Sequence, residues 1–585
     1  MKLLLAAVAL TIGCIGLKSA GDYPQEPEPP GIEDKIILNV DAPSTQLLDS
    51  GEANETGSIE VVFEYVDDFP SDHDEIDSLE ERTEHRIAAG EHFQRENEER
   101  AKAIALRNYT DVYVSKYSPF IVFEYPSLSE FLTEDYAKLS LSDSDDLCAI
   151  FVDEDSGCDL ADRNDSSVSI YPFTQAKEDI GLPDHPEYDG TGIKIGSIEG
   201  GAPDNSSNLA GVTCHVFGEY RDPHAFYTSS IYGGNSGIAK GAEIYFACLE
   251  NKTFIQCADW LVENDVDVVN VSAGWMTGSY DDKSAYVDFA AKQYGISFCV
   301  SAGNEGESNK INSVSIAVNA ISVASNDSNL KISSFSSSGL RKKERKKLSK
   351  PTLTAPGGSL YGIPYVSETI SGTSLSAPMV TGIVAILMQE FPLLRGHPEN
   401  VLSALTVSAI PIKGQEDIWD EDAGFGLVNY ERARKAARAF GTGNVTGRYK
   451  EGESVWDKTI TISSGETFHF NNTFLFNGTE STKISSVKFS ALESRLKDSS
   501  GRVVATSKRF SNFSTLIYTN NGAEQEYRLD LYLLEDNRKN GISDFYGFTY
   551  FLSDDTDLLN IRSNISFGYK NERLVDSSLE RSAFV

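Results

Sequence analysis

Apolar side chains occupy every face of a helix between Val380 and Gln389. A helix of this kind is buried at the centre of a large domain, and this one is too short to span a bilayer. It follows directly on Ser371-Gly372-Thr373-Ser374, where small residues indicate a tight turn. Ser374 is therefore expected where a turn becomes a helix. Unpaired backbone N–H groups and the positive end of the helix dipole favour negative charge beside its oxygen, so Ser374 is a candidate nucleophile.

The N-terminal quarter has a mixed pattern of strands and helices. Residues 59–65 alternate as a strand does, and the charged residues 80–106 have a helical composition. The further expected elements are strands at 111–116 and 120–125, a helix at 127–139 and a strand at 147–152. This order is typical of a small α+β domain of the split βαβ type, which we place at 58–165. The acidic, Pro-rich stretch at 17–57 is expected to be a linker.

Short alternating runs characterise the chain from about Gly441 onward. They lie at 459–462, 467–470, 487–492, 503–506, 527–533 and 548–551, with turn sequences between them. Regularly spaced short strands predict a β-sandwich over 441–585. No cluster of carboxylates there has the spacing of a calcium loop, so a binding role for this domain stays open.

Length and charge add two constraints. A chain of 585 residues is too long for one hydrophobic core, so several domains are expected. The formal net charge is −37, and residues 21–165, with 38 acidic and 10 basic side chains, supply −28 of it. The acidity therefore belongs to the N-terminal quarter. Nucleic acid is not an expected partner, because such a field repels phosphates.

The first residues have the pattern of an export signal. Lys2 is followed by an apolar stretch from Leu3 to Ile15, which predicts a secretory signal over 1–16 and a secreted or surface-exposed protein. Lipidation of Cys14 is the alternative. The six other cysteines allow fifteen pairings and prove none, and they include no Cys/His cluster that indicates a metal. No cofactor is expected, and calcium dependence is not readable.

Chemically distinctive residues follow several apolar runs of the middle region. Asp189 to Gly201 is expected to form a turn, a buried strand and a glycine turn, with Glu199 at the end of the strand. His224 follows Asp222-Pro223 at the start of an expected helix, and a Gly/Ala-rich turn at 237–244 comes next. His215 is a competing histidine that lacks this context.

Two further buried strands end in small residues. The strand 266–271 leads into Ser272-Ala273-Gly274, and a second strand leads into Ser301-Ala302-Gly303-Asn304. Together with Gly372-Thr373-Ser374 and Pro378, and with Glu199 and His224 in the order acid, histidine, serine, these segments resemble the subtilisin-like serine proteases, or subtilases. The resemblance covers about residues 166–440.

This resemblance implies an α/β fold, a doubly wound and mainly parallel sheet, and a serine endopeptidase that forms an acyl-enzyme. Ser374 would be the nucleophile, His224 the general base and Glu199 the acid that holds the histidine. Asn304 would donate to the oxyanion. Residues Ser272, Ala273 and Gly274 would line one wall of the primary specificity pocket, and Ser301, Ala302 and Gly303 the other. Polypeptides would be the substrates.

The resemblance also gives a role to the N-terminal domain, as an inhibitory propeptide of a self-processed precursor. The polar stretch Cys158–Ser167 would be the maturation site. Protonation of His73, His85 and His92 would loosen docking of the propeptide, and the basic loop 341–347 would dock it or be cut autolytically. The mature protein is expected to be a monomer. Glu305 would favour a basic substrate side chain only weakly, as a rim charge.

Three departures from the family pattern leave alternatives open. Glu199 stands where the family has aspartate and is one methylene longer, while Ala225 and Phe226 replace the usual glycine and threonine after the histidine. A pseudoprotease that binds peptides without cutting them is one alternative. A surface adhesion protein whose β-domain carries the function is the other.

Overall fold

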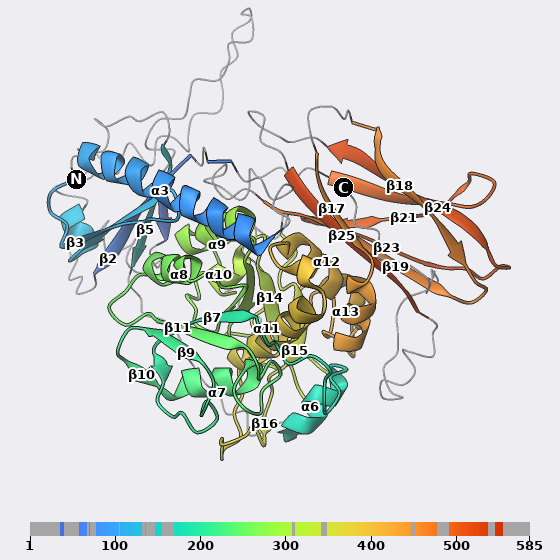
Figure 1. Cartoon of the computed structure of the whole chain (residues 1–585), viewed down its shortest axis with the longest axis horizontal. Coiled ribbons are helices and arrows are strands. Elements are labelled where there is room, and N and C mark those ends of the chain that lie inside the picture. The colour runs from blue at the N-terminus through green and yellow to red at the C-terminus, as the bar shows by residue number, and fades with distance from the viewer. Residues whose placement is uncertain are drawn as a thin grey trace, which may run out of the picture.

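We analysed a computed structural model of the chain, which describes residues 36–39, 58–66, 69–70, 78–104, 106–131, 135, 147–154, 169–306, 311–340, 348–445, 451–476, 491–535 and 544–553. Figure 1 shows three parts in chain order: an N-terminal α+β domain, a central α/β domain and a C-terminal β domain. The predicted signal, the maturation segment 158–167 and the basic loop 341–347 lie outside the described residues.

The central domain is built on one parallel sheet of seven strands in the order β15-β14-β13-β12-β7-β11-β9. Every neighbouring pair in it is parallel. The strands are β7 (Lys194–Glu199), β9 (Cys214–Phe217), β11 (Glu243–Cys248), β12 (Val268–Val271), β13 (Ser297–Ser301), β14 (Ile321–Asn326) and β15 (Leu353–Pro356). The expected doubly wound, mainly parallel sheet is confirmed.

Helices cover both faces of this sheet, because its strands are apolar on both sides. The helices α7 (Pro223–Tyr232) and α11 (Thr373–Glu390) share one apolar core with one face. The helices α8 (Phe254–Glu263) and α9 (Asp282–Tyr294) share a second core with the other. The remaining elements of the domain are β6 (Tyr171–Pro172), α6 (Phe173–Asp179), β8 (Ala202–Pro203), β10 (Arg221–Asp222), α10 (Ser313–Ile316), β16 (Leu360–Tyr361), η4 (Pro392–Leu394), α12 (Pro398–Ser408) and α13 (Tyr430–Ala437).

The N-terminal domain contains an antiparallel arrangement of four strands in the order β5-β2-β4-β3. Its strands are β2 (Ile59–Tyr65), β3 (Asp111–Val114), β4 (Phe120–Tyr125) and β5 (Leu147–Glu154). Its long helix is α3 (Leu79–Ala103), and Ser127 caps α4 (Leu128–Glu130) where the second helix was expected. One prediction is wrong: the supposed linker 17–57 contains β1 (Ile36–Asn39), which pairs in parallel with β5. The apolar run Ile36-Ile37-Leu38 offers a free edge of that sheet a partner, and the acidic composition around it hid this strand.

The N-terminal domain lies against α8 and α9, and the apolar side chains on one face of its sheet and on α3 belong to the same core as theirs. Asp259 of α8 is the polar centre of the contact. Its carboxylate accepts hydrogen bonds from the Tyr113 hydroxyl at 2.7 Å, from the Ser115 hydroxyl at 2.7 Å and from the Lys116 N–H at 3.1 Å. Burial raises the pKa of Asp259, and these hydrogen bonds counteract that shift.

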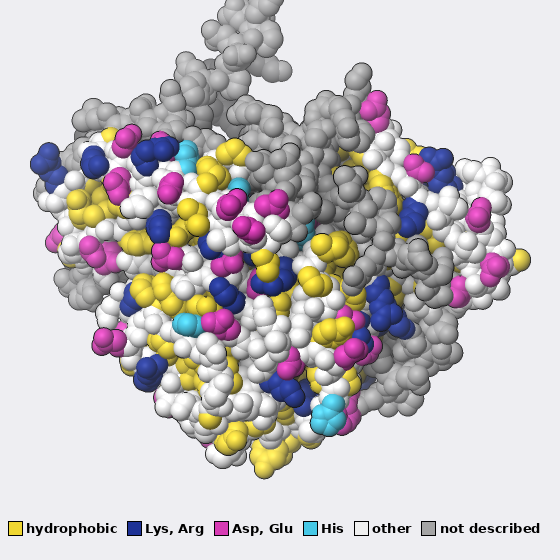
Figure 2. Space-filling view, viewed as in Figure 1, with side chains coloured by type: hydrophobic (Ala, Val, Ile, Leu, Met, Phe, Trp, Pro, Cys, Tyr) yellow, Lys and Arg dark blue, Asp and Glu magenta, His cyan; other side chains and the backbone are white. Residues whose placement is uncertain are grey.

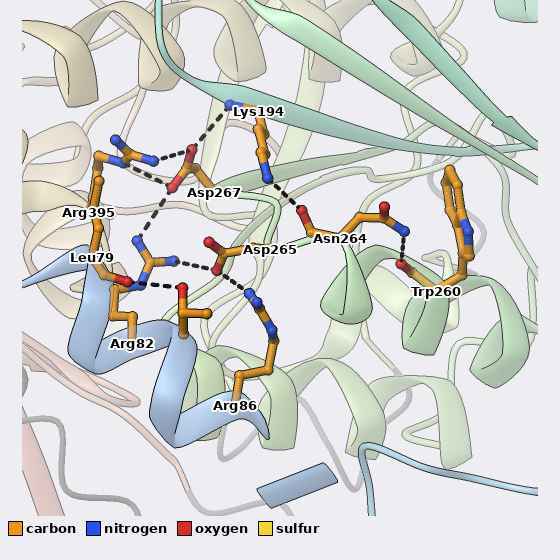
Figure 3. Close-up of polar contacts among 10 residues, drawn as sticks. Leu79, Arg82, Arg86, Lys194, Trp260, Asn264, Asp265, Asp267 and Arg395 are labelled. Atoms are coloured by element: carbon orange, nitrogen blue, oxygen red, sulfur yellow. Dashed lines mark hydrogen bonds and ion pairs between the residues drawn. The ribbon is translucent and has the colours of Figure 1, made fainter. Parts of the chain in front are cut away.

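A second polar contact ties α3 to the central domain, and Figure 3 shows its side chains pointing toward one another. Arg82 lies 3.3 Å from the carboxylate of Asp267, and Arg86 pairs with Asp265. Arg395 of the central domain binds both oxygens of Asp267, at 2.9 and 3.0 Å. Asp267 is fully buried, so its charge is balanced from both domains at once.

The C-terminal domain is a sandwich of two sheets, ordered β17-β25-β19-β23-β22 and β18-β24-β20-β21, with one apolar core drawn from both. The strands are β17 (Phe440–Val445), β18 (Ser454–Ile462), β19 (Thr467–Phe474), β20 (Ala491–Lys497), β21 (Val503–Thr506), β22 (Lys508–Phe510), β23 (Phe513–Thr519), β24 (Gln525–Glu535) and β25 (Asp544–Ser553). The sequence reading missed β17, β22 and β23. The last helix of the central domain, α13, ends at Ala437, and Phe440 already pairs with β25.

Acidic and basic side chains are interspersed on the face shown in Figure 2, over α3 and over the central domain. Among the described residues, Cys214, Cys248, Cys257 and Cys299 are free thiols. Within the described ranges, no helix has both the length and the apolar character needed to cross a membrane.

Candidate active site

Three neighbouring strands of the central sheet deliver the candidate residues to one edge. Glu199 is the last residue of β7, Ser272 follows β12 directly and Ser301 ends β13. The three strands are adjacent and parallel, so their carboxyl ends meet at the same edge. Ligands of open α/β sheets bind at this edge.

Glu199 and His224 are in direct contact. His224 is the second residue of α7, whose first turn is capped by Asp222 through a 2.9 Å hydrogen bond from the His224 N–H. The Nδ1 of His224 lies 2.9 Å from Oε2 of Glu199. Both side chains are buried, with 4% and 1% of their surface exposed. The longer glutamate therefore reaches the histidine without any break in the sheet.

The second oxygen of the Glu199 carboxylate also has a partner, which sequence reasoning missed. Thr228, one turn after His224 on α7, donates its hydroxyl to Oε1 of Glu199 at 2.7 Å. The two carboxylate oxygens are thus held by two side chains of one helix. Thr228 stands four residues after the histidine, and that helical spacing is the signal that points to it.

Ser374 is the second residue of α11 and follows Gly372, which begins the helix without a side-chain cap. Pro378 lies inside α11 and has no N–H to donate to the Ser374 carbonyl four residues earlier. That carbonyl instead accepts the Ser272 hydroxyl at 3.0 Å. The Ser272 oxygen in turn accepts from the Asn270 amide at 2.9 Å. The strand β12 is therefore joined to the nucleophile by a hydrogen bond that replaces one of the helix.

Asn304 lies beside the same turn. Its Oδ1 accepts from the N–H of Thr373 at 2.9 Å and from the Thr373 hydroxyl at 3.1 Å, and the other end of the amide, Nδ2, is a hydrogen-bond donor. A methyl group built on Gly372 would lie 2.9 Å from Ser374 Oγ and 3.7 Å from Asn304 Nδ2. The serine oxygen and the amide nitrogen therefore border the same space, which a side chain at Gly372 would fill.

The two predicted pocket walls face each other across Asn312, a residue that the sequence reading did not single out. Its Nδ2 donates to the carbonyl of Ala273 at 3.0 Å and to the carbonyl of Ser301 at 3.1 Å. Gly303, in the second wall, donates its N–H to the Thr373 hydroxyl at 3.0 Å. Both walls are thus held to each other and to the start of α11.

His215 and Glu305 lie outside this arrangement. His215 is on the edge strand β9, half exposed, stacked on Tyr245 and 2.6 Å from Glu243. The structure therefore gives His215 a surface hydrogen bond to Glu243 and leaves His224 as the histidine beside Glu199. Glu305 is held through its backbone, whose N–H donates to Ser337 at 2.9 Å.

Parts of this chain are similar in sequence or in structure to proteins of known function. Residues 159–426 match the Subtilase family. Subtilisin DY of Bacillus licheniformis is 28% identical over 271 residues, which are 42% of this chain and 92% of that protein. The extracellular serine proteinase of a Thermus strain is 30% identical over 202 residues, 32% of this chain and 46% of that one. The solved structure of fervidolysin from Fervidobacterium pennivorans covers 79% of this chain and 69% of its own, with a TM-score of 0.44 and 16% identity.

The central domain is therefore that of a serine-type endopeptidase. Within that class, residues 159–426 match the subtilases, so this region is that of a subtilisin-like serine protease. It spans 92% of subtilisin DY but less than half of the Thermus enzyme.

Proposed function

We propose that Glu199, His224 and Ser374 are the catalytic triad of this protease. The observation that carries the proposal is the 2.9 Å contact between Glu199 and His224 Nδ1, since a carboxylate that holds Nδ1 suits a ring whose Nε2 acts as the base. His224 takes the Ser374 proton as the hydroxyl attacks the scissile carbonyl, and returns it to the leaving amine. Glu199 holds the ring and stabilises its cation.

Asn304 and the backbone N–H of Ser374 are the proposed donors to the oxyanion. The Asn304 amide supports this role because Thr373 occupies its oxygen and directs its nitrogen to the space beside Ser374. The oxygen that becomes negative in the tetrahedral intermediate would lie in that space, where fixed donors stabilise it without reorganisation.

The chain is, in this proposal, an exported precursor that cuts itself between the N-terminal and central domains. Three features support it: the signal-like first residues, the split βαβ domain that buries apolar surface against α8 and α9, and the polar segment 158–167 between the two domains. Related proteins include the minor extracellular protease Epr of Bacillus subtilis. The docked domain inhibits until it is released. The mature enzyme acts on polypeptides as a monomer.

Two measurements on the full-length chain test these assignments. A fluorophosphonate probe should label the wild-type protein and fail to label Ser374→Ala. The wild-type precursor should separate into two fragments with a new N-terminus between residues 155 and 168, and Ser374→Ala should stay whole. Labelling that persists without Ser374 would refute the nucleophile, and cleavage that persists in the variant would refute self-processing.

A further inference from the structure

The slot between the two pocket walls is occupied by a side chain of this chain. A methyl group built on Gly274, in the first wall, would lie 2.6 Å from Cε of Met276. A methyl group built on Gly303, in the second wall, would lie 2.6 Å from Sδ and 3.3 Å from Cε of the same residue. The end of the Met276 side chain therefore lies between the two walls and against both.

Asn312 closes the same slot from another side. The methyl group on Gly274 would also lie 2.7 Å from Nδ2 of Asn312, and that nitrogen bonds the carbonyls of both walls. The Asn312 oxygen accepts from the N–H groups of Trp275 and Val314, at 3.3 and 3.2 Å. Asn312 is fully buried, so four hydrogen bonds hold it in place.

The wall that contains Gly303 cannot move back to widen the slot. Gly303 has a φ of +112°, a backbone conformation that residues with a side chain rarely adopt. The methyl group built on it would also lie 2.8 Å from the Ser337 hydroxyl. A space that is bounded by Gly303, Gly274 and Asn312 and filled by a thioether leaves little room for a substrate side chain.

From this geometry we propose that Met276 is a specificity-determining residue, which restricts the protease to polypeptides with Gly, Ala or Ser on the amino side of the scissile bond. The inference rests on the proposed function, because it takes Ser272–Gly274 and Ser301–Gly303 as the walls that receive that side chain. A bulky Leu or Phe must displace Met276, and Asn312 still blocks the slot behind it. Shape exclusion of this kind sets specificity by penalising the wrong substrate.

The test compares peptide p-nitroanilides that differ only in the residue before the scissile bond, Ala or Phe, on protein whose active sites are first counted with a fluorophosphonate. The wild-type protein should favour Ala over Phe in kcat/KM by about tenfold or more, since a few methylene groups in a pocket change selectivity on that scale. Met276→Ala should shift the ratio toward Phe by about tenfold or more. Met276 is half-buried, so its truncation leaves the core intact.

Met276→Leu is the matched control, because it keeps the volume and should keep the preference for Ala. A wild-type enzyme that cleaves after Phe as readily as after Ala overturns the inference alone, as does a ratio that Met276→Ala leaves unchanged. A protein that neither reacts with the fluorophosphonate nor hydrolyses any of the peptides overturns the proposed function, and the inference with it.

Discussion

The Thr228 hydroxyl donates to Oε1 of Glu199 at 2.7 Å, while the other oxygen of that carboxylate faces His224. A glutamate has one more rotatable bond than an aspartate, so it needs a second contact to hold one orientation. Thr228 supplies that contact from the helix that carries the histidine. The hydroxyl thus compensates for the added methylene of Glu199.

The first prediction concerns this hydroxyl. Thr228→Val keeps the shape and leaves Oε1 of Glu199 buried without its donor, at a cost of about 1–3 kcal/mol. We expect kcat to fall by about tenfold or more with little change in KM, because Thr228 orients the triad and does not touch substrate. Thr228→Ser is the control and should restore most of kcat. If both variants lower kcat equally, loss of packing and not the hydrogen bond is the cause.

The second prediction concerns the acid itself. Glu199→Gln keeps the size but removes the charge that stabilises the histidine cation, and kcat should fall by about 10⁴. Glu199→Asp keeps the charge but shortens the reach to both His224 and Thr228, so a smaller loss is expected. Steady-state hydrolysis of one peptide by the three proteins gives the ranking. Near-full activity of the glutamine variant would remove Glu199 from the triad.

The third prediction concerns the anchor between α3 and the central domain. Arg82→Ala removes one of the two arginines on the buried Asp267, so docking of the N-terminal domain should weaken by about 1–3 kcal/mol. After self-processing, the delay before peptide hydrolysis begins should shorten accordingly. Arg95→Ala is the matched control, because Arg95 is also on α3 but is 63% exposed and contacts His92 and Glu96 of the same helix. Equal delays in the two variants would show that the Arg82 contact does not stabilise docking.

The fourth prediction concerns pH. Burial raises the pKa of Asp259 above its usual 3.8, so this group stabilises the folded protein fully below about pH 3.8, and its contribution is lost as the pH rises through the raised value. In a Ser374→Ala background, which prevents cutting, the free energy of unfolding should fall with rising pH more steeply for Asp259 than for Asp259→Asn. The difference between the two curves isolates this group from the other carboxylates. Parallel curves from pH 4 to 8 would contradict the prediction.

Local sequence signals predict much of the central domain. Uninterrupted apolar runs mark the helix that begins at Thr373 and the strand that ends at Glu199. A proline at the first helical position marks the helix Pro398–Ser408. The motifs shared with the subtilases also predict that Glu199 and His224 lie at one site. Such signals are local, and a single sequence contains them.

The parts that the sequence did not reveal depend on contacts between distant segments. Met276 and Asn312 fill one slot, but nothing in their neighbouring residues shows that Gly274 and Gly303 face each other across it. The strand at Ile36 is hidden for the same reason, since its partner β5 lies more than a hundred residues later. Packing of this kind is decided by the fold and not by the local pattern.

Pro378 affects both the stability of α11 and the positioning of Ser374. By withholding one N–H it weakens α11, and it thereby frees the carbonyl that the Ser272 hydroxyl binds. This hydrogen bond fixes the position of α11, which carries Ser374, relative to β12, the strand that leads to the proposed substrate wall. Replacing Pro378 with a better helix former would stabilise α11 but would remove the hydrogen bond that joins α11 to β12. The most stable version of this helix would therefore make a less active protease.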